Sequence, residues 1–218
     1  RRLCCFALLR RLLRRRRRRL RLAARLFVAA LLALCLFRSI LLRLGICERK
    51  ARTAVVLLGA TTAFWKYTVT DFSEVTQAAF LLGALNAVLS NSSAKWRKVS
   101  FWCALLVGMK VAYVVLLPIF SLFAWLEKEG APAKERLRSM LDYTCFLVPL
   151  GLLLALANYL RFGTPIETGY GSQATAFSVE YFRRDWFDYL FSTQRGILPF
   201  NPILLVALPG WLLVPTNH

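Results

Sequence analysis

Long apolar runs separated by short polar segments dominate this sequence and limit what the chain can fold into. The runs cover residues 23–42, 54–70, 72–89, 99–126, 139–159 and 202–214. Several of them approach the roughly 20 residues that an α-helix needs to cross a lipid bilayer. Because 58% of the residues are hydrophobic and strand-like alternation is absent, the sequence predicts an all-α fold, a polytopic transmembrane helical bundle.

A strongly basic N-terminal segment precedes the first apolar run. The net charge is +19, from 30 Lys and Arg against 11 Asp and Glu, and Arg residues crowd positions 1–22. We interpret these residues as a basic interfacial segment ahead of a partial transmembrane domain over residues 23–214. Since the chain begins with Arg rather than Met, we expect a fragment of a longer protein.

The basic segment has several possible roles. An amphipathic helix on anionic lipid, a nucleic-acid-binding arm, an imperfect start of the reading frame and a basic flank without a specific ligand are the alternatives. An apolar run follows the segment at once, so we expect membrane lipid as a partner and no nucleic acid. The six cysteines form no C-x-x-C pair and the single histidine is His218, which excludes a cysteine knuckle and a histidine-based metal site or triad.

Basic loops set the expected direction of each apolar run through the membrane. Lys and Arg gather in residues 43–52, 91–98 and 127–138, which the positive-inside rule places in the cytosol. The short turn at 71–74 and the long polar segment at 160–201 then face the exoplasmic side. So much polar backbone cannot sit in hydrocarbon, because each unpaired amide costs several kcal/mol there. This topology puts the Arg-rich N-terminus outside, against the same rule, and that conflict stays open.

The apolar run at 99–126 carries Lys110 near its middle and has a basic loop on each side. A hairpin of two short helices, bent at residues 108–110, would enter and leave on one side, whereas a single long tilted helix would cross. We expect the hairpin, because a charge at the midplane of one helix is costly while a hairpin tip can meet water or headgroups. Pro149 with Gly151 predicts a kink in the next run.

Acidic and basic residues near the exoplasmic turn are candidates for chemistry. Glu74 begins an apolar run in the sequence T-D-F-S-E. A carboxylate there is stabilised by the helix dipole, and Asp71 or Ser73 can cap the helix, which is a structural role. The functional alternative is that Asp71 and Glu74 bind a divalent metal ion or an acceptor hydroxyl. Lys66 and Lys110 either hold a lipid-linked phosphate or only extend towards the membrane surface.

A second group of candidates follows the run at 139–159. Arg161 comes directly after it, and its guanidinium can grip a phosphate in a bidentate way or anchor the helix end. Glu167 and Tyr170 lie among glycines, in a turn-rich loop that can approach a ligand closely. The aromatic, amphipathic stretch at 179–191 predicts an interfacial helix, with carbohydrate stacking as the alternative. The predicted substrate-binding residues are Glu74, Lys110, Arg161, Glu167 and Tyr170.

Three stretches in chain order resemble motifs of one enzyme group. Y-L-R-F-G-T-P-I-E-T-G-Y-G with L-F-S-T-Q-R-G-I-L-P-F-N-P-I-L-L resembles the patterns R-F-G-S-P-x-E-x-G-Y and S-P-x-x-G-L-x-x-x-S-P. T-V-T-D-F-S-E-V resembles Y-S-x-x-x-F-S-E-P, and V-S-F-W-C-A-L-L-V-G-M-K-V-A-Y-V-V-L-L-P resembles G-L-x-x-G-x-x-x-L-x-K-P-x-x-L-L-L-P. The patterns are those of GT-C superfamily membrane glycosyltransferases, which include protein-mannosyltransferase-like and aminoarabinose-transferase-like enzymes. The likeness covers residues 54–210.

The resemblance implies an enzyme of the bacterial inner (plasma) membrane that transfers a sugar from a polyprenyl-phosphate donor at the exoplasmic face. Glu74, Lys110 and Arg161 match the family pattern by position. The family's catalytic base is an acidic residue of an upstream exoplasmic loop without a counterpart here, and Val111 stands where the family has Pro. We therefore assign no catalytic residue. A non-catalytic polytopic membrane protein, such as a transporter or an assembly subunit, is the alternative.

Overall fold

The structure, a computed structural model, describes residues 24, 26–61, 64, 73–167, 179–193 and 197–200, and every regular element within them is helical. This confirms the predicted all-α class for the part of the chain that is described. A first helix, Leu26–Arg43, precedes the labelled elements. These are α2 (Glu48–Thr61), α4 (Glu74–Val88), α5 (Lys95–Met109), η1 (Val111–Leu116), α6 (Leu117–Leu126), α7 (Ala133–Thr144), α8 (Leu147–Phe162), α9 (Val179–Phe191) and α10 (Ile197–Phe200).

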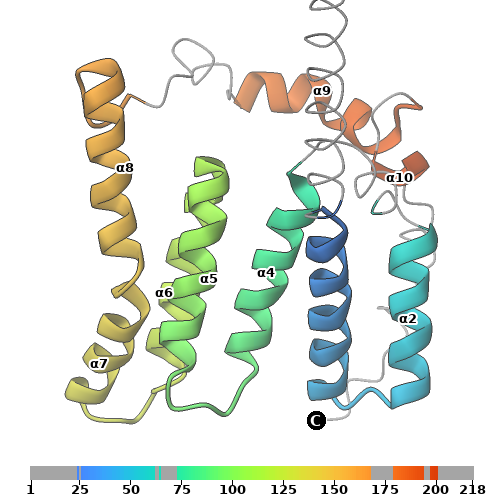
Figure 1. Cartoon of the computed structure of the whole chain (residues 1–218), viewed down its shortest axis with the longest axis horizontal. Helices are drawn as coiled ribbons and strands as arrows, with labels where there is room; N and C mark the ends of the chain where they lie inside the picture. Colours follow the sequence, from blue (N-terminus) through green and yellow to red (C-terminus); the bar gives the residue numbers. More distant parts are fainter. Residues whose placement is uncertain are drawn as a thin grey trace, which may run out of the picture.

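The longer helices stand side by side, and their ends define two ends of the bundle (Figure 1). The connections at residues 44–47, 89–94 and 127–132 lie together at what we call the inner end. The start of α4 and the last turns of α5 and α8 lie at the opposite, outer end, where α9 runs crosswise. The helices therefore alternate in direction as the basic loops predicted, and the first helix starts at the outer end, so the conflict over the N-terminus persists.

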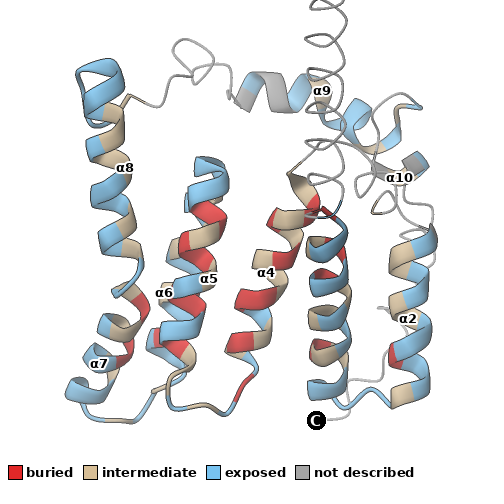
Figure 2. Ribbon diagram, viewed as in Figure 1, coloured by how far each residue is buried: buried red, intermediate tan, exposed pale blue. Residues whose placement is uncertain are grey.

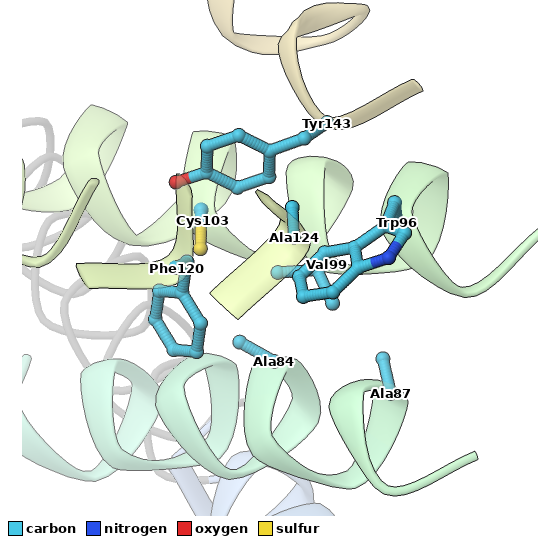
Figure 3. Close-up of a cluster of buried hydrophobic side chains, with 8 residues drawn as sticks. All are labelled: Ala84, Ala87, Trp96, Val99, Cys103, Phe120, Ala124 and Tyr143. Atoms are coloured by element: carbon cyan, nitrogen blue, oxygen red, sulfur yellow. The ribbon is translucent and has the colours of Figure 1, made fainter. Parts of the chain in front are cut away.

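The core lies between α4, α5, α6 and α7 (Figure 3). Gly83 lets α4 and α5 approach closely at Trp102. A Cβ at Gly83 would lie only 2.5 Å from Cδ2 of that tryptophan. The lack of a side chain at Gly83 therefore lets Trp102 pack directly against the α4 backbone. The buried cluster comprises Ala84, Ala87, Trp96, Val99, Cys103, Phe120, Ala124 and Tyr143.

The predicted hairpin is present as α5, η1 and α6. The helix breaks at Lys110, whose backbone is extended (φ −155°, ψ 112°). The two arms return to the same end, because Glu127 pairs with Lys95 and accepts a 2.9 Å hydrogen bond from Trp96 Nε1. The helical arm begins at Lys95, within the segment predicted as a loop, since Lys and Arg are good helix formers and this ion pair holds the first turn.

The kink predicted at Pro149 and Gly151 lies slightly earlier than expected. The helix is interrupted at residues 145–146, between α7 and α8. Pro149 has no N–H to donate to the carbonyl four residues before it, that of Cys145, and its ring displaces that carbonyl. At the break, the amide of Phe146 donates to Ser100 Oγ at 3.0 Å, so a buried hydroxyl of α5 satisfies one donor of the interrupted helix.

Within the part of the chain that the structure describes, two helical stretches are long and apolar enough to cross a membrane: Leu26–Arg43 and the 30 residues Ala133–Phe162. Only 6% of the most apolar part of the second is buried within the chain, and Figure 2 shows α8 exposed along most of its length. The third predicted span is shorter than expected, since α4 has 15 residues, about 22 Å of helix against a hydrocarbon core of about 30 Å. Of the run at 54–70, α2 covers the first part, and 202–214 lies outside the described residues.

Candidate functional site

A polar cluster occupies the outer end of the bundle, where α4 begins and the hairpin turns. We call it the outer polar cluster, and it consists of Ser73, Glu74 and Gln77 from the start of α4 with Lys110 and Tyr113 from the hairpin. Two of the five predicted substrate-binding residues, Glu74 and Lys110, belong to it. The break at Lys110 places η1 against the first turns of α4, because the chain turns back there instead of continuing outward.

A chain of hydrogen bonds joins the hairpin to α4. Tyr113 OH donates to Gln77 Oε1 at 3.0 Å, and Gln77 Nε2 donates to Ser73 Oγ at 2.6 Å. Gln77 is 3% exposed, so a primary amide has been placed in an apolar interface and needs these partners. Ser73 and Gln77 lie four residues apart, on one face of the helix. The chain of bonds thus fixes the orientation of the amide and the position of the phenol.

Glu74 is the one carboxylate of the outer polar cluster, and one of its oxygens is unsatisfied. Its Oε2 is buried and has no hydrogen-bond partner among the described residues. The helix dipole at the start of α4 favours the negative charge. A buried acceptor without a donor nevertheless costs about 1–3 kcal/mol, which a water or a ligand hydroxyl placed there would recover. Glu74 therefore keeps one buried acceptor that no described donor satisfies.

Lys110 supplies a cation at the same level. Its side chain is exposed, and it forms no ion pair within the part of the chain that is described. The contact between Gly83 of α4 and Trp102 of α5 gives a common reference level for the two helices. At 1.5 Å per residue, Lys110 lies about 12 Å outward from Trp102, and Glu74 lies about 14 Å outward from Gly83. The cation and the carboxylate therefore lie at about the same level of the bundle.

Arg161 stands well beyond this level. It lies in the last turn of α8, and the helix ends at Gly163, whose backbone is left-handed (φ +76°). The glycines after Arg161 predicted turns in this part of the chain. Leu150 of α8 packs against Gly108 of α5, and Arg161 follows eleven residues later, about 16 Å further outward. Figure 1 shows α8 extending past the end of α5. Glu74 and Lys110 thus lie at about one level, and Arg161 lies further outward at the same end of the bundle.

The remaining predicted residues have different outcomes. Glu167 is partly buried a few residues after the end of α8, whereas Asp71, Lys66 and Tyr170 lie outside the described residues. Among the described residues no group of three or more His, Cys, Asp or Glu could hold a metal ion, so the metal site predicted at Asp71 and Glu74 stays a prediction. The interfacial stretch at 179–191 is a helix with those bounds, α9, which lies crosswise at the outer end (Figure 1).

Sequence reasoning missed Gln77 and Tyr113. A signal was present for the glutamine, which is a strongly polar residue one turn into an otherwise apolar run. Its partner follows 36 residues later and gave no comparable signal, because a tyrosine in an apolar run reads as a core residue. No protein-family model, curated protein or solved structure matches this chain.

Proposed function

We propose that this chain is a GT-C-like glycosyltransferase-type membrane protein, which binds a polyprenyl-phosphate sugar at the outer end of a polytopic transmembrane bundle. The observation that carries the proposal is the outer polar cluster, in which an unsatisfied carboxylate and a cation lie at one level of the bundle and hydrogen bonds join α4 to the hairpin. The motif resemblance supplies the ligand class. It also supplies the bacterial inner membrane as the location and a divalent metal ion as a further component.

The depth of the cluster supports a lipid-borne ligand. By the helix rise, the level of Lys110 is about 15 Å short of the outer end of α8. If that end lies at the outer edge of a hydrocarbon core about 30 Å thick, Lys110 and Glu74 lie near its middle, well below the headgroups. Ionisable residues at such a depth are expensive and mark ligand or ion paths by default. A ligand that carries its own hydrocarbon tail can bring an anion to this depth.

The residue types suit a phosphate-linked sugar. The Lys110 ammonium attracts the donor phosphate as a point charge. Glu74 Oε2 accepts a hydrogen bond from a hydroxyl of the sugar or of the acceptor, and the bonded Tyr113, Gln77 and Ser73 hold the wall of the site in place. Arg161 is too far from Lys110 for both cations to hold one phosphate, so the phosphate belongs to Lys110. The exposed apolar face of α8 offers a surface for the polyprenyl tail.

The transfer itself forms one bond and breaks one. The acceptor oxygen bonds to the anomeric carbon of the sugar, the bond from that carbon to the phosphate oxygen breaks, and polyprenyl phosphate leaves with the electron pair. The acceptor proton passes to a base, which the resembled family supplies from an upstream exoplasmic loop. In this chain the proposed residues bind and orient the donor, and none of them is assigned as that base.

Binding of farnesyl phosphate and of a farnesyl-phosphate sugar to the full chain in phosphatidylcholine nanodiscs tests the proposal. Lys110→Gln should weaken both ligands about tenfold, the loss of one charge-assisted contact. Glu74→Gln should weaken the sugar-bearing ligand alone. Lys50→Gln, the same change at the exposed inner end of α2, is the matched control and should have no effect. Equal binding of both ligands by all four proteins would refute the proposal and favour a non-catalytic membrane protein.

A further inference from the structure

We propose that the cleft at the inner end of the bundle is a second anion site, which binds a phosphate group. The cleft lies between the connection at residues 90–93, the start of α5, the end of α6 and one side of α7, and its volume is about 640 Å³. It is at the opposite end of the bundle from the outer polar cluster. The inference therefore does not depend on the proposed transferase function.

One basic side chain that lines the cleft has no acidic partner among the described residues. Each acidic side chain in the lining is paired with a basic one: Glu127 with Lys95, Asp142 with Arg97 at 3.5 Å, and Glu135 with Lys128 at 4.0 Å. Arg138 also lines the cleft and has no ion pair among the residues that the structure describes. Its planar guanidinium can donate two parallel hydrogen bonds to a phosphate. The lining as a whole thus attracts an anion.

The first turn of α5 carries basic residues, which the positive end of the helix dipole disfavours. Its N-cap is Ala94, which provides no side-chain hydrogen bond, and its first turn contains no acidic residue. Lys95, Arg97 and Lys98 lie there instead, where the positive end of the helix dipole repels cations. Lys95 and Arg97 are paired with carboxylates and the Lys95 amide donates to the Ser92 carbonyl at 3.0 Å, so an anion here would meet the remaining amides of the first turn. Both the unmatched Arg138 and the start of α5 therefore favour the same class of ligand.

The position of the cleft admits two sources of phosphate. The hydroxyls of Ser92 and Ser93 and the amide of Asn91 add neutral donors to the lining. If the apolar part of α8 spans a bilayer, this cleft is at the inner membrane surface, within reach of lipid headgroups. It is equally open to a soluble phosphate ester. The shared chemistry is a phosphate held by Arg138 beside the first turn of α5.

Calorimetric titration of the full chain in phosphatidylcholine nanodiscs tests this inference, with glycerol 3-phosphate as the soluble probe and phosphatidic acid in the bilayer as the lipid probe. Saturable binding of glycerol 3-phosphate would identify a soluble phosphate ester as the ligand, and binding of phosphatidic acid alone would identify a lipid headgroup. Either result supports the site. Arg138→Gln should weaken the bound probe at least tenfold. Arg49→Gln, an exposed arginine of α2 outside the cleft, should leave it unchanged.

A second variant protects the test against a folding defect. Arg138→Lys keeps the charge but loses the forked geometry, and it should bind the probe a few-fold more weakly than the wild type. Absence of saturable binding to either probe would overturn the inference. An equal loss in Arg138→Gln and Arg49→Gln would overturn it too, because that result would mean general attraction to a basic surface.

Discussion

Gly83→Ala tests the closest helix contact of the bundle. The added Cβ would lie 2.5, 2.6 and 2.9 Å from three ring atoms of Trp102, distances that real Cβ contacts do not show. The indole cannot yield freely, because Phe80 and Phe101 lie against it with ring centroids 5.9 and 5.5 Å away. Overpacking costs about 1–3 kcal/mol, while Ala is better than Gly within a helix by about 1 kcal/mol. We expect a net loss of roughly 1 kcal/mol in the free energy of unfolding.

Thermal unfolding in detergent micelles measures this loss, as a fall in Tm of a few degrees. Gly59→Ala is the matched control, since a Cβ there would lie 3.5 Å from Leu34, an ordinary contact, and the change should stabilise α2. Adding Gly83→Ala to a Trp102→Leu background should cost nothing, because the space for the methyl group is then free. A Gly83→Ala protein as stable as the wild type would refute the packing that we describe.

Three further changes test local contacts. Ser100→Ala removes the partner of the Phe146 amide and should lower the unfolding free energy by about 1–3 kcal/mol, measured by thermal unfolding. Hydrogen bonds from Arg38 and Arg52 hold the pKa of Glu48 below its ordinary value of 4.5. The destabilisation by Glu48→Gln should therefore be full at about pH 6 and vanish as the pH falls through that lowered pKa. Glu127→Gln weakens the contact with Lys95 that closes the hairpin, and should speed amide hydrogen exchange in α6.

Each of these changes has a control or a contradicting result. Ser121→Ala removes a hydroxyl whose contact, with Met140 Sδ, is 3.8 Å long, and it should be nearly neutral; equal losses at Ser100 and Ser121 would contradict the role of the first. A destabilisation by Glu48→Gln that persists at low pH would mean that packing, not charge, explains it. Glu129→Gln changes a neighbouring exposed carboxylate and should leave exchange in α6 unaltered.

The hairpin and the interfacial helix could be predicted from the sequence because each has a local signal. A lysine inside an apolar run with a basic loop on both sides leaves few topologies. The stretch at 179–191 alternates aromatic and charged residues with a helical period, and α9 has those bounds. The break between α7 and α8 was placed a few residues late, because a proline disturbs the turn before it and not its own position.

The site could be predicted only in part. Glu74 stands out as a charge at the start of one apolar run and Lys110 as a charge near the middle of another, and the motif resemblance already grouped them. The bond between Gln77 and Tyr113 depends on how far η1 turns back along α4, which no local pattern encodes. The distance between Lys110 and Arg161 depends on the relative lengths of α5 and α8 and on where the two helices pack, and the sequence alone gives neither packing point.

Cysteine accessibility tests the central claim, that the outer polar cluster and the basic loops lie on opposite sides of a membrane. Single cysteines at Ser93, Glu129 and Thr164, in a chain whose six native cysteines are replaced, would be treated with an impermeant maleimide on intact cells. We predict labelling of Thr164→Cys from outside, and of Ser93→Cys and Glu129→Cys only after permeabilisation. Labelling of Thr164→Cys from the same side as Ser93→Cys, or of Ser93→Cys and Glu129→Cys from different sides, would contradict the account.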